Sequence, residues 1–246
     1  MLDLSPHSLR FVRDLIIRDR RRCGGSWYRM PPGRQGLLVL VWFRNNHTFA
    51  ELAGGFNVGL ATAWRYVQQV LSLRAPLAVS LPHALAAADR NRFIVLDGTC
   101  IGIDRVADRR YWCGQHRRYE VNIQALISPE GDPVWTSPGL PGVTYDLTAA
   151  RDHGLLAALA EADVLTLGDK GYQGAGQPVH TPYKGKNLPP AYQEANKAFN
   201  RLRAPGERAF AQLKGWKVLR HYRGCPTTVG DLVRAVLVLH QRETYR

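Results

Sequence analysis

Two apolar runs in the second half of this 246-residue sequence each lead into an aspartate, and this pattern constrains the fold most. Residues 93–96 are followed by Asp97, and residues 164–167 are followed, one residue later, by Asp169. Short apolar runs of this kind are typical of buried strands, and a carboxylate at a strand end is costly to bury unless a cation neutralises it. The sequence therefore predicts a sheet whose strand ends carry acids around a cationic group.

A third acid, Glu207, opens the helical pattern of residues 205–215, with Pro205 suited to the first helical position. Taken alone, an aspartate after a strand is often a turn residue, and a glutamate in a first helical turn often only stabilises the helix dipole. Carboxylates converging from two strand ends and a helix would instead form a hard-oxygen site suited to Mg²⁺, as in metal-assisted phosphodiester chemistry.

The order of expected elements predicts the fold class. Strands are expected at residues 93–96, 119–127, 133–136 and 164–167, with a turn at 129–132. Helices are expected through the first 75 residues and at 152–162, 190–202, 205–215 and 229–241. This order matches a ribonuclease H-like α/β domain, a mixed sheet flanked by helices, preceded by an all-α domain. We expect the division to fall between residues 1–85 and 86–246.

The expected all-α domain contains a helix-turn-helix pattern at residues 48–73. Thr48 and Glu51 have the spacing of a capping box, and Gly54-Gly55 is expected to end the first helix. The second helix, residues 59–73, carries Leu60, Ala63, Val67 and Val70 at the spacing of one buried face.

In such a motif the second helix enters the DNA major groove. Thr62, Arg65 and Gln68 would then face the DNA. Many helical bundles contain a similar turn, so the charge of the chain matters to this interpretation.

The chain is strongly basic, with 33 Lys and Arg against 20 Asp and Glu and a net charge of +13. A surplus of that size indicates a polyanionic partner, either nucleic acid or an anionic membrane. The longest apolar run, residues 36–43, is too short to span a membrane, and the N-terminus lacks the apolar core of a signal peptide. We therefore expect double-stranded DNA as the partner, no membrane, and a cytoplasmic, nucleoid-associated location.

Four scattered cysteines, Cys23, Cys100, Cys113 and Cys225, are expected to be free thiols in a reducing compartment. Cys113 and His116 have the spacing of metal ligands, and Cys100 lies upstream. One such pair does not supply the four ligands of a tetrahedral zinc site, so the spacing alone is a weak signal.

Several stretches are similar to one protein family. They are residues 96–99 (Leu-Asp-Gly-Thr), 119–124, 142–149, 168–174 and 203–216. Through them the chain resembles the DDE transposases of bacterial insertion sequences, in the insertion-sequence-five group related to PIF/Harbinger elements. Many of these transposases have Tyr, two residues, Arg, three residues, Glu, six residues and Lys. Arg203, Glu207 and Lys214 fit those spacings, whereas Asn200 stands where the family has tyrosine.

The resemblance implies that Asp97, Asp169 and Glu207 bind two Mg²⁺ ions, with Mn²⁺ as a substitute. It implies DNA cleavage and strand transfer at terminal inverted repeats by at least a dimer on the DNA. Further residues would assist: Arg203, Lys214 and Lys217 at the DNA, and Asp146 and Lys170 beside the acids. A catalytically silent DNA-binding regulator and a ribonuclease H-like nuclease without strand transfer remain the alternatives.

Overall fold

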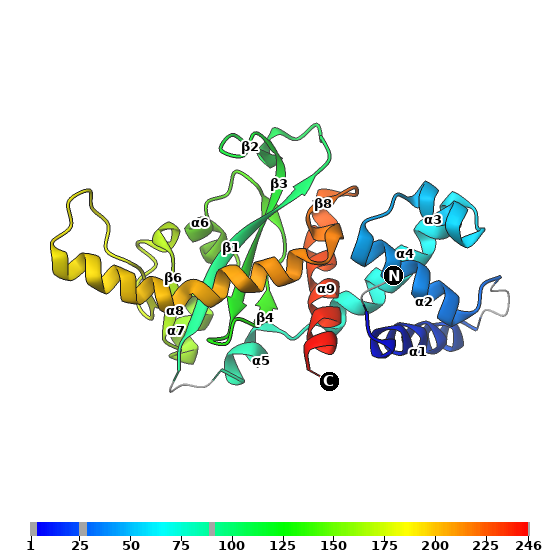
Figure 1. The fold of residues 1–246 in the computed structure, drawn as a ribbon, viewed down its shortest axis with the longest axis horizontal. Coiled ribbons are helices and arrows are strands. Elements are labelled where there is room, and N and C mark those ends of the chain that lie inside the picture. Colours follow the sequence, from blue (N-terminus) through cyan, green and yellow to red (C-terminus); the bar gives the residue numbers. More distant parts are fainter. Residues whose placement is uncertain (1–3, 25–28, 89–91, 246) are drawn as a thin grey trace. The chain divides into compact units, whose positions relative to one another are not determined.

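The computed structural model describes residues 4–24, 29–88 and 92–245 and divides the chain into two compact units (Figure 1). One unit comprises Met1–Ala78, Leu213–Tyr222 and Asp231–Arg246, and the other comprises Val79–Gln212 and Arg223–Gly230. This grouping differs from the linear division expected at residue 85, because two C-terminal segments belong to the same unit as the N-terminal helices. We describe each unit separately.

The first unit is built from helices. They are α1 (Pro6–Cys23), α2 (Pro32–Asn45), α3 (Phe49–Phe56), α4 (Leu60–Arg74) and most of α9 (Val229–Thr244). Contacts between the ends of the chain hold α1 to α9: Ser5 donates its backbone N–H to Glu243, and the Arg242 guanidinium lies 3.7 Å from the centre of the Phe11 ring. The helices predicted for the first 75 residues and for the closing segment are confirmed. None of the described helices is both long enough and apolar enough to cross a membrane.

The predicted capping box at the start of α3 is present. The Thr48 hydroxyl accepts a hydrogen bond from the Glu51 N–H at 3.2 Å, and the Glu51 carboxylate accepts one from the Thr48 N–H at 2.7 Å. The predicted end of this helix is wrong, because α3 continues through Gly54 and Gly55. It ends at Phe56, and Asn57 caps it with a φ of 51°, in the left-handed region that asparagine tolerates.

Helix α4 turns most of the predicted face inward: Ala63, Val67 and Val70 are buried. Leu60 is an error in that prediction, since it lies at the first residue of α4 and is 58% exposed. A polar contact also fixes α4, because Gln69 donates to the buried Asp19 of α1 at 2.6 Å.

The second unit contains a mixed sheet with strand order β2-β3-β1-β6-β7, and β4 and β5 also pair with β3. The strands are β1 (Ile94–Ile103), β2 (Trp112–Cys113), β3 (Arg118–Ile127), β4 (Pro133–Thr136), β5 (Leu140–Pro141), β6 (Thr166–Gly168) and β7 (Val179–His180). Strands β1, β6 and β7 run parallel, whereas β3 runs antiparallel to β1. This sheet, flanked by helices, confirms the predicted ribonuclease H-like α/β class, and the predicted strands 119–127 and 133–136 correspond to β3 and β4.

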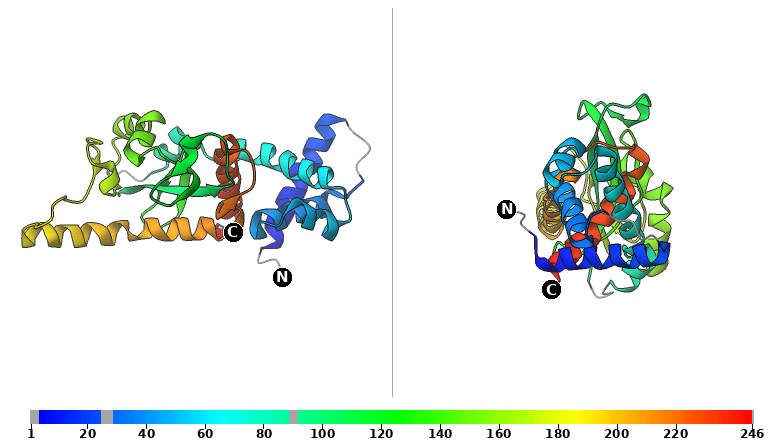
Figure 2. Two further views of the ribbon diagram at one scale, coloured as in Figure 1. Left: turned by 90° about the horizontal axis from the view of Figure 1, so that it is seen from above. Right: turned by 90° about the vertical axis from the view of Figure 1, so that its right-hand side faces the viewer.

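Helices cover both faces of this sheet (Figures 1 and 2). On one face Ile94 and Leu96 pack in a cluster with α5 (Leu81–Ala86), α6 (Asp146–Asp152) and α7 (Leu155–Ala162). On the other face Val95 packs with Ala209 of α8 (Pro190–Lys214). Because successive strand residues point to opposite faces, this packing decides which face each polar side chain of β1 reaches.

Two predicted boundaries in this unit are wrong. Strand β1 does not end before Asp97 but continues to Ile103, so Asp97 lies inside a strand rather than in a turn. The two helices expected at 190–202 and 205–215 are one helix, α8, with Pro205 in its interior. Glu207 is therefore not in a first helical turn, and the argument from the helix dipole does not apply to it.

Candidate active site

Asp97 lies on the face of the sheet that α8 covers. Val95 and Asp97 are two residues apart on β1, so both side chains point to this face. Gly206 of α8 approaches both closely: a Cβ atom on Gly206 would lie 3.2 Å from Val95 Cγ1 and 3.4 Å from Asp97 Oδ2. One turn earlier on α8, Arg203 places a guanidinium nitrogen 3.7 Å from Asp97 Oδ2. Both side chains are 16% exposed, so the pair is largely shielded from water.

Two further aspartates lie close to Asp97. Asp169 directly follows β6, as predicted, and its Oδ1 accepts a hydrogen bond from the Gly171 N–H at 2.7 Å. Asp146 is the first residue of α6. A Cβ atom on Gly171 would lie 2.8 Å from Asp169 Oδ1 and 3.4 Å from Asp146 Oδ2, so both carboxylates border this glycine.

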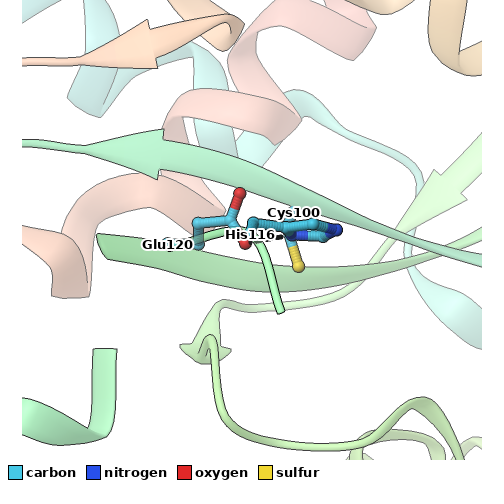
Figure 3. A group of neighbouring side chains, drawn as sticks. All are labelled: Cys100, His116 and Glu120. Atoms are coloured by element: carbon cyan, nitrogen blue, oxygen red, sulfur yellow. Dashed lines mark hydrogen bonds and ion pairs between the residues drawn. The ribbon is translucent and has the colours of Figure 1, made fainter. Parts of the chain in front are cut away.

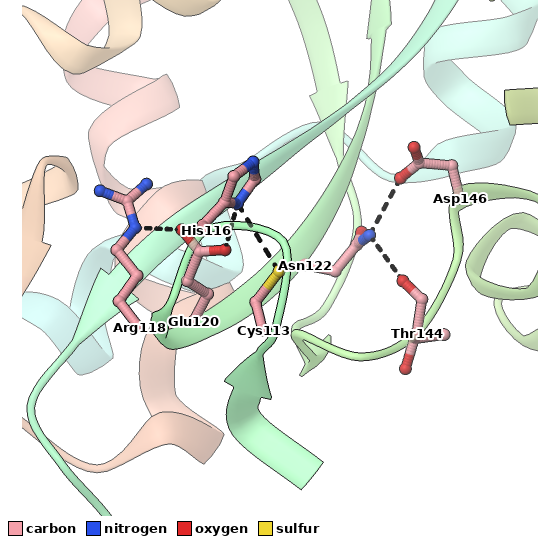
Figure 4. Close-up of polar contacts among 7 residues, drawn as sticks. All are labelled: Cys113, His116, Arg118, Glu120, Asn122, Thr144 and Asp146. Carbon is pink, nitrogen blue, oxygen red and sulfur yellow. Dashed lines mark hydrogen bonds and ion pairs between the residues drawn. The ribbon is translucent and has the colours of Figure 1, made fainter. Parts of the chain in front are cut away.

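Amide side chains on β3 orient Asp146, and Figure 4 shows the contact from Asn122. Asp146 Oδ1 accepts hydrogen bonds from Asn122 Nδ2 at 2.9 Å and Gln124 Nε2 at 3.0 Å. The buried hydroxyl of Tyr172 donates to the side-chain amide oxygen, Oε1, of Gln124. Oδ1 accepts both amide bonds, and the other oxygen, Oδ2, lies near Gly171.

Sequence reasoning did not single out Asn122, Gln124 or Tyr172 as site residues. A signal for the first two exists, because Glu120, Asn122 and Gln124 alternate with apolar residues along β3. Three polar side chains on one face of a buried strand require partners. Tyr172 carries no comparable signal, since its partner Gln124 lies 48 residues away in the sequence.

The charge of Asp97 is not fully compensated. Burial raises its pKa from 3.8 to about 6, and the neighbouring charges of Asp169 and Asp146 act in the same direction. Arg203 and the Gly98 N–H oppose this rise without cancelling it. A permanent ion pair that satisfied Asp97 would lower its pKa instead. The site thus favours an additional cation.

Glu207 follows Gly206, which lies close to Asp97, and the side chain of Glu207 is exposed. The charges that act on Asp97 are those of Arg203, Asp169 and Asp146, and the role of Glu207 as a third metal ligand stays a prediction. Lys170 is exposed directly after Asp169.

Asn200 and the predicted DNA-contacting residues Lys214 and Lys217 lie on α8 or directly after it. Asn200 is exposed on α8. Lys214 ends α8 and Lys217 begins a short 3₁₀ turn, Lys217–Leu219, and both belong to the first unit. Their contact with DNA is a prediction.

The donor set fits a hard divalent cation. Asp97, Asp169 and Asp146 offer carboxylate oxygens, the ligands that Mg²⁺ and Mn²⁺ prefer. The first two are the predicted ligands, and Asp146, expected only beside them, places its Oδ2 near Gly171, which Asp169 also borders.

On the first unit, the predicted DNA-facing residues of α4 are accessible to different degrees. Arg65 is exposed and its guanidinium donates to the Thr62 hydroxyl at 3.3 Å, while Thr62 and Gln68 are half-buried. At the N-terminus of α4, Arg29, Arg34 and Thr62 line part of a hollow of about 460 Å³. The positive end of a helix and cationic side chains in this place suit a phosphate.

Comparisons with known proteins agree with both parts of this architecture. The family described as DDE superfamily endonuclease matches residues 96–241, and the family described as helix-turn-helix of DDE superfamily endonuclease matches residues 28–78. A protein of Streptomyces albus G, described as a transposase for insertion sequence element IS112, is 30% identical over 210 residues, which cover 83% of this chain and 77% of that protein. No solved structure matches. The chain therefore belongs to the DDE superfamily endonucleases, among the transposases of bacterial insertion sequences.

Proposed function

We propose that this protein binds the terminal inverted repeats of its insertion sequence and catalyses metal-dependent cleavage and strand transfer of the DNA ends. The observation that carries the proposal is the group of three neighbouring aspartates in which burial and mutual repulsion hold the pKa of Asp97 at about 6 despite Arg203. Such a site is stabilised by divalent cations, which the family uses for phosphodiester chemistry.

Asp97, Asp169 and Glu207 would hold the cations, Mg²⁺ or Mn²⁺, two of them by the family pattern. We add Asp146, because its Oδ2 borders Gly171 together with Asp169. Bound divalent ions would activate the attacking water or 3′-hydroxyl and stabilise the leaving oxygen.

The protein's own groups would position the DNA. Arg203 lies against Asp97 and has a buried Nε that no described group satisfies, so its guanidinium is suited to turn towards a scissile phosphate when a cation replaces it at Asp97. Lys214, Lys217 and Lys170 would contact neighbouring phosphates. Asn122 and Gln124 keep Asp146 in place by their amide hydrogen bonds.

The helix-turn-helix would recognise the element ends. One side of α4 carries Thr62, Arg65 and Gln68, which are spaced three residues apart. Arg65 already donates a hydrogen bond to Thr62. The partner is double-stranded DNA, first the element ends and then the target within the bacterial nucleoid. Joining two ends requires at least two protomers on the DNA.

A cleavage assay on DNA that carries the element's ends tests the proposal. The wild-type protein should cut and join the ends with Mg²⁺ or Mn²⁺ and not with EDTA. Asp97→Asn, Asp169→Asn and Glu207→Gln should each lose at least a hundredfold in cleavage rate while binding the ends with unchanged affinity.

Other outcomes would identify the alternatives. Tight binding of the ends without cleavage by the wild-type protein would indicate a silent regulator. Cleavage of branched or hybrid substrates with no preference for the ends would indicate a nuclease without strand transfer. Normal cleavage by Glu207→Gln, together with loss in an Asp146→Asn variant, would give the third ligand position to Asp146.

A further inference from the structure

A second group of metal-ligating side chains lies on the sheet beside the three aspartates, and the proposed function does not use it. Cys100 is on β1, Glu120 is on β3, and His116 is in the loop between β2 and β3 (Figure 3). One ligand atom from each of the three lies within 4.8 Å of the others. Among the described residues, this group alone brings three Cys, His, Asp or Glu side chains so close together.

A fourth donor, Cys113, lies outside this group of three but contacts His116. Its Sγ lies 3.7 Å from His116 Nδ1, and the same nitrogen lies 2.7 Å from Glu120 Oε2 (Figure 4). In a tetrahedral zinc site with bonds of about 2.0–2.3 Å, the ligand atoms are roughly 3.3–3.8 Å apart. The Cys113–His116 distance already fits, and the Glu120–His116 pair needs to open by only about half an ångström to admit the ion.

The backbone explains why these residues meet. In the antiparallel pairing of β1 with β3, Cys100 is opposite Asn122 and Gly102 is opposite Glu120. Gly102 has no side chain, so Cys100 is the side chain of β1 adjacent to Glu120 on that face. Cys113 pairs with Arg118 at the start of β3, which brings the loop with His116 over the same place.

The charges are suited to a cation. The buried carboxylate of Glu120 is contacted by both His116 and Arg118. Arg118 bonds to Oε1, and His116 approaches Oε2. A cation that bonds to Oε2 would therefore leave the Arg118 ion pair intact, and Arg118 would balance part of the negative charge of two thiolates and a carboxylate.

We propose that Cys100, Cys113, His116 and Glu120 bind one divalent cation of borderline softness, zinc above all, at a site separate from the carboxylate site at Asp97. Thiolate and imidazole ligands select zinc over Mg²⁺, whereas the three aspartates offer oxygen alone. The bound ion would fix the β2–β3 loop to β1. It would also hold β3 next to Asn122, which orients Asp146.

Metal binding by the reduced full-length protein tests this proposal. After removal of metal, we expect one equivalent of Co²⁺ to give the near-ultraviolet thiolate-to-cobalt charge-transfer band, and one equivalent of Zn²⁺ to abolish it. Zn²⁺ affinity, measured by competition with a chromophoric chelator, should fall at least tenfold in Cys100→Ser, Cys113→Ser and His116→Ala. His116 is 44% exposed, so its replacement is not expected to disturb folding.

Two control variants separate this site from other sources of metal binding. Cys225→Ser removes an exposed thiol outside the group, and Asp97→Asn alters the carboxylate site. Both should retain the cobalt band and the zinc affinity of the wild-type protein, whatever the fate of cleavage activity. The proposal therefore stands or falls independently of the proposed transposase function.

Limited trypsin digestion gives a second readout. Arg117 is exposed in the loop, so Zn²⁺ should slow cleavage after Arg117 in the wild-type protein and have no effect in His116→Ala. The proposal is overturned if the wild-type protein shows no thiolate-to-cobalt band, if Cys225→Ser loses it as completely as Cys100→Ser, or if Cys100 and Cys113 form a disulfide that resists added reductant.

Discussion

At the residue level, the buried carboxyl of Asp97 links the stability of the protein to pH. Its pKa in the folded protein is about 6, above the ordinary value of 3.8. Below about pH 4 the carboxyl of Asp97 is protonated in both the folded and the unfolded chain, so it does not lower the free energy of unfolding. Between about pH 4 and 6 the folded chain binds more protons, so the contribution of Asp97 to stability is lost as pH rises.

This linkage predicts the behaviour of Asp97→Asn. In metal-free buffer at pH 7 the variant should be more stable than the wild-type protein by about 1–3 kcal/mol, because it removes a destabilising charge but leaves Arg203 without its partner. At pH 4 the advantage should disappear. Urea unfolding at both pH values measures the difference, and a difference that does not change with pH would contradict the assignment.

Added Mg²⁺ should reverse the order of stability of the wild-type protein and Asp97→Asn. A cation that binds the folded state raises its free energy of unfolding by mass action, and Asp97→Asn has lost a ligand. The wild-type protein should therefore gain stability with Mg²⁺ and the variant should not.

Gly98 leaves space for Asp146 beside β1. A Cβ atom on Gly98 would lie 2.8 Å from Asp146 Cγ and 3.0 Å from Gln124 Nε2, and both side chains are held by hydrogen bonds. Gly98→Ala should displace Asp146, lower the free energy of unfolding by about 1–3 kcal/mol and reduce cleavage at least a hundredfold. Binding of DNA ends should be unchanged in a gel-shift assay.

Gly54→Ala is the matched control for that substitution. Gly54 lies within α3 and a Cβ atom there would meet nothing within 4 Å. Replacement should raise the free energy of unfolding by about 0.5–1 kcal/mol, as for a glycine in an open helix interior. If both alanine variants lost similar stability, the contact with Asp146 would not be the cause.

At the level of elements, α3 begins with a capping box whose contribution to stability can be measured by a single substitution. Thr48→Ala removes the hydroxyl that accepts the Glu51 N–H and should cost about 1 kcal/mol of stability, measured by urea unfolding. Thr48→Ser keeps the hydroxyl and should lose a few tenths of a kcal/mol at most. Equal losses in the two variants would mean that the methyl group, rather than the cap, stabilises α3.

Elements whose signals are local could be predicted from the sequence. The strand at residues 119–127, the turn at 129–132 and the capping box at Thr48 depend on residues close together in the chain, and the structure contains all three. Asp97 and Asp169 were recognised because each follows an apolar run. These signals require no knowledge of the packing.

Boundaries decided by packing could not be predicted in the same way. Pro205 is locally suited to start a helix, yet α8 continues through it while Gly206 packs on Val95. Gly98 resembles a turn residue, yet β1 continues because β3 pairs with it as far as Gly102. The partners of Asp146 on β3 are 22 and 24 residues away in sequence, so only the folded chain brings them together.

At the level of the whole molecule, the proposed recognition residues and the proposed catalytic acids belong to different compact units. Binding and chemistry should therefore respond to different substitutions. Arg65→Ala should weaken binding of the element ends by about 1–3 kcal/mol and relax sequence preference at one position, as expected when a base contact is lost. Its Mg²⁺-dependent gain in stability should equal that of the wild-type protein.

Lys217→Ala separates base recognition from phosphate contact on the same unit. A lost phosphate contact should weaken binding to any duplex to the same extent and reduce the dependence of log affinity on log salt concentration by about one unit. Gel shifts of specific and random duplexes at several salt concentrations distinguish the two variants. If Asp97→Asn lost end binding as severely as Arg65→Ala, the acids would be needed for the fold or for DNA binding, and the assignment of chemistry to the second unit would be wrong.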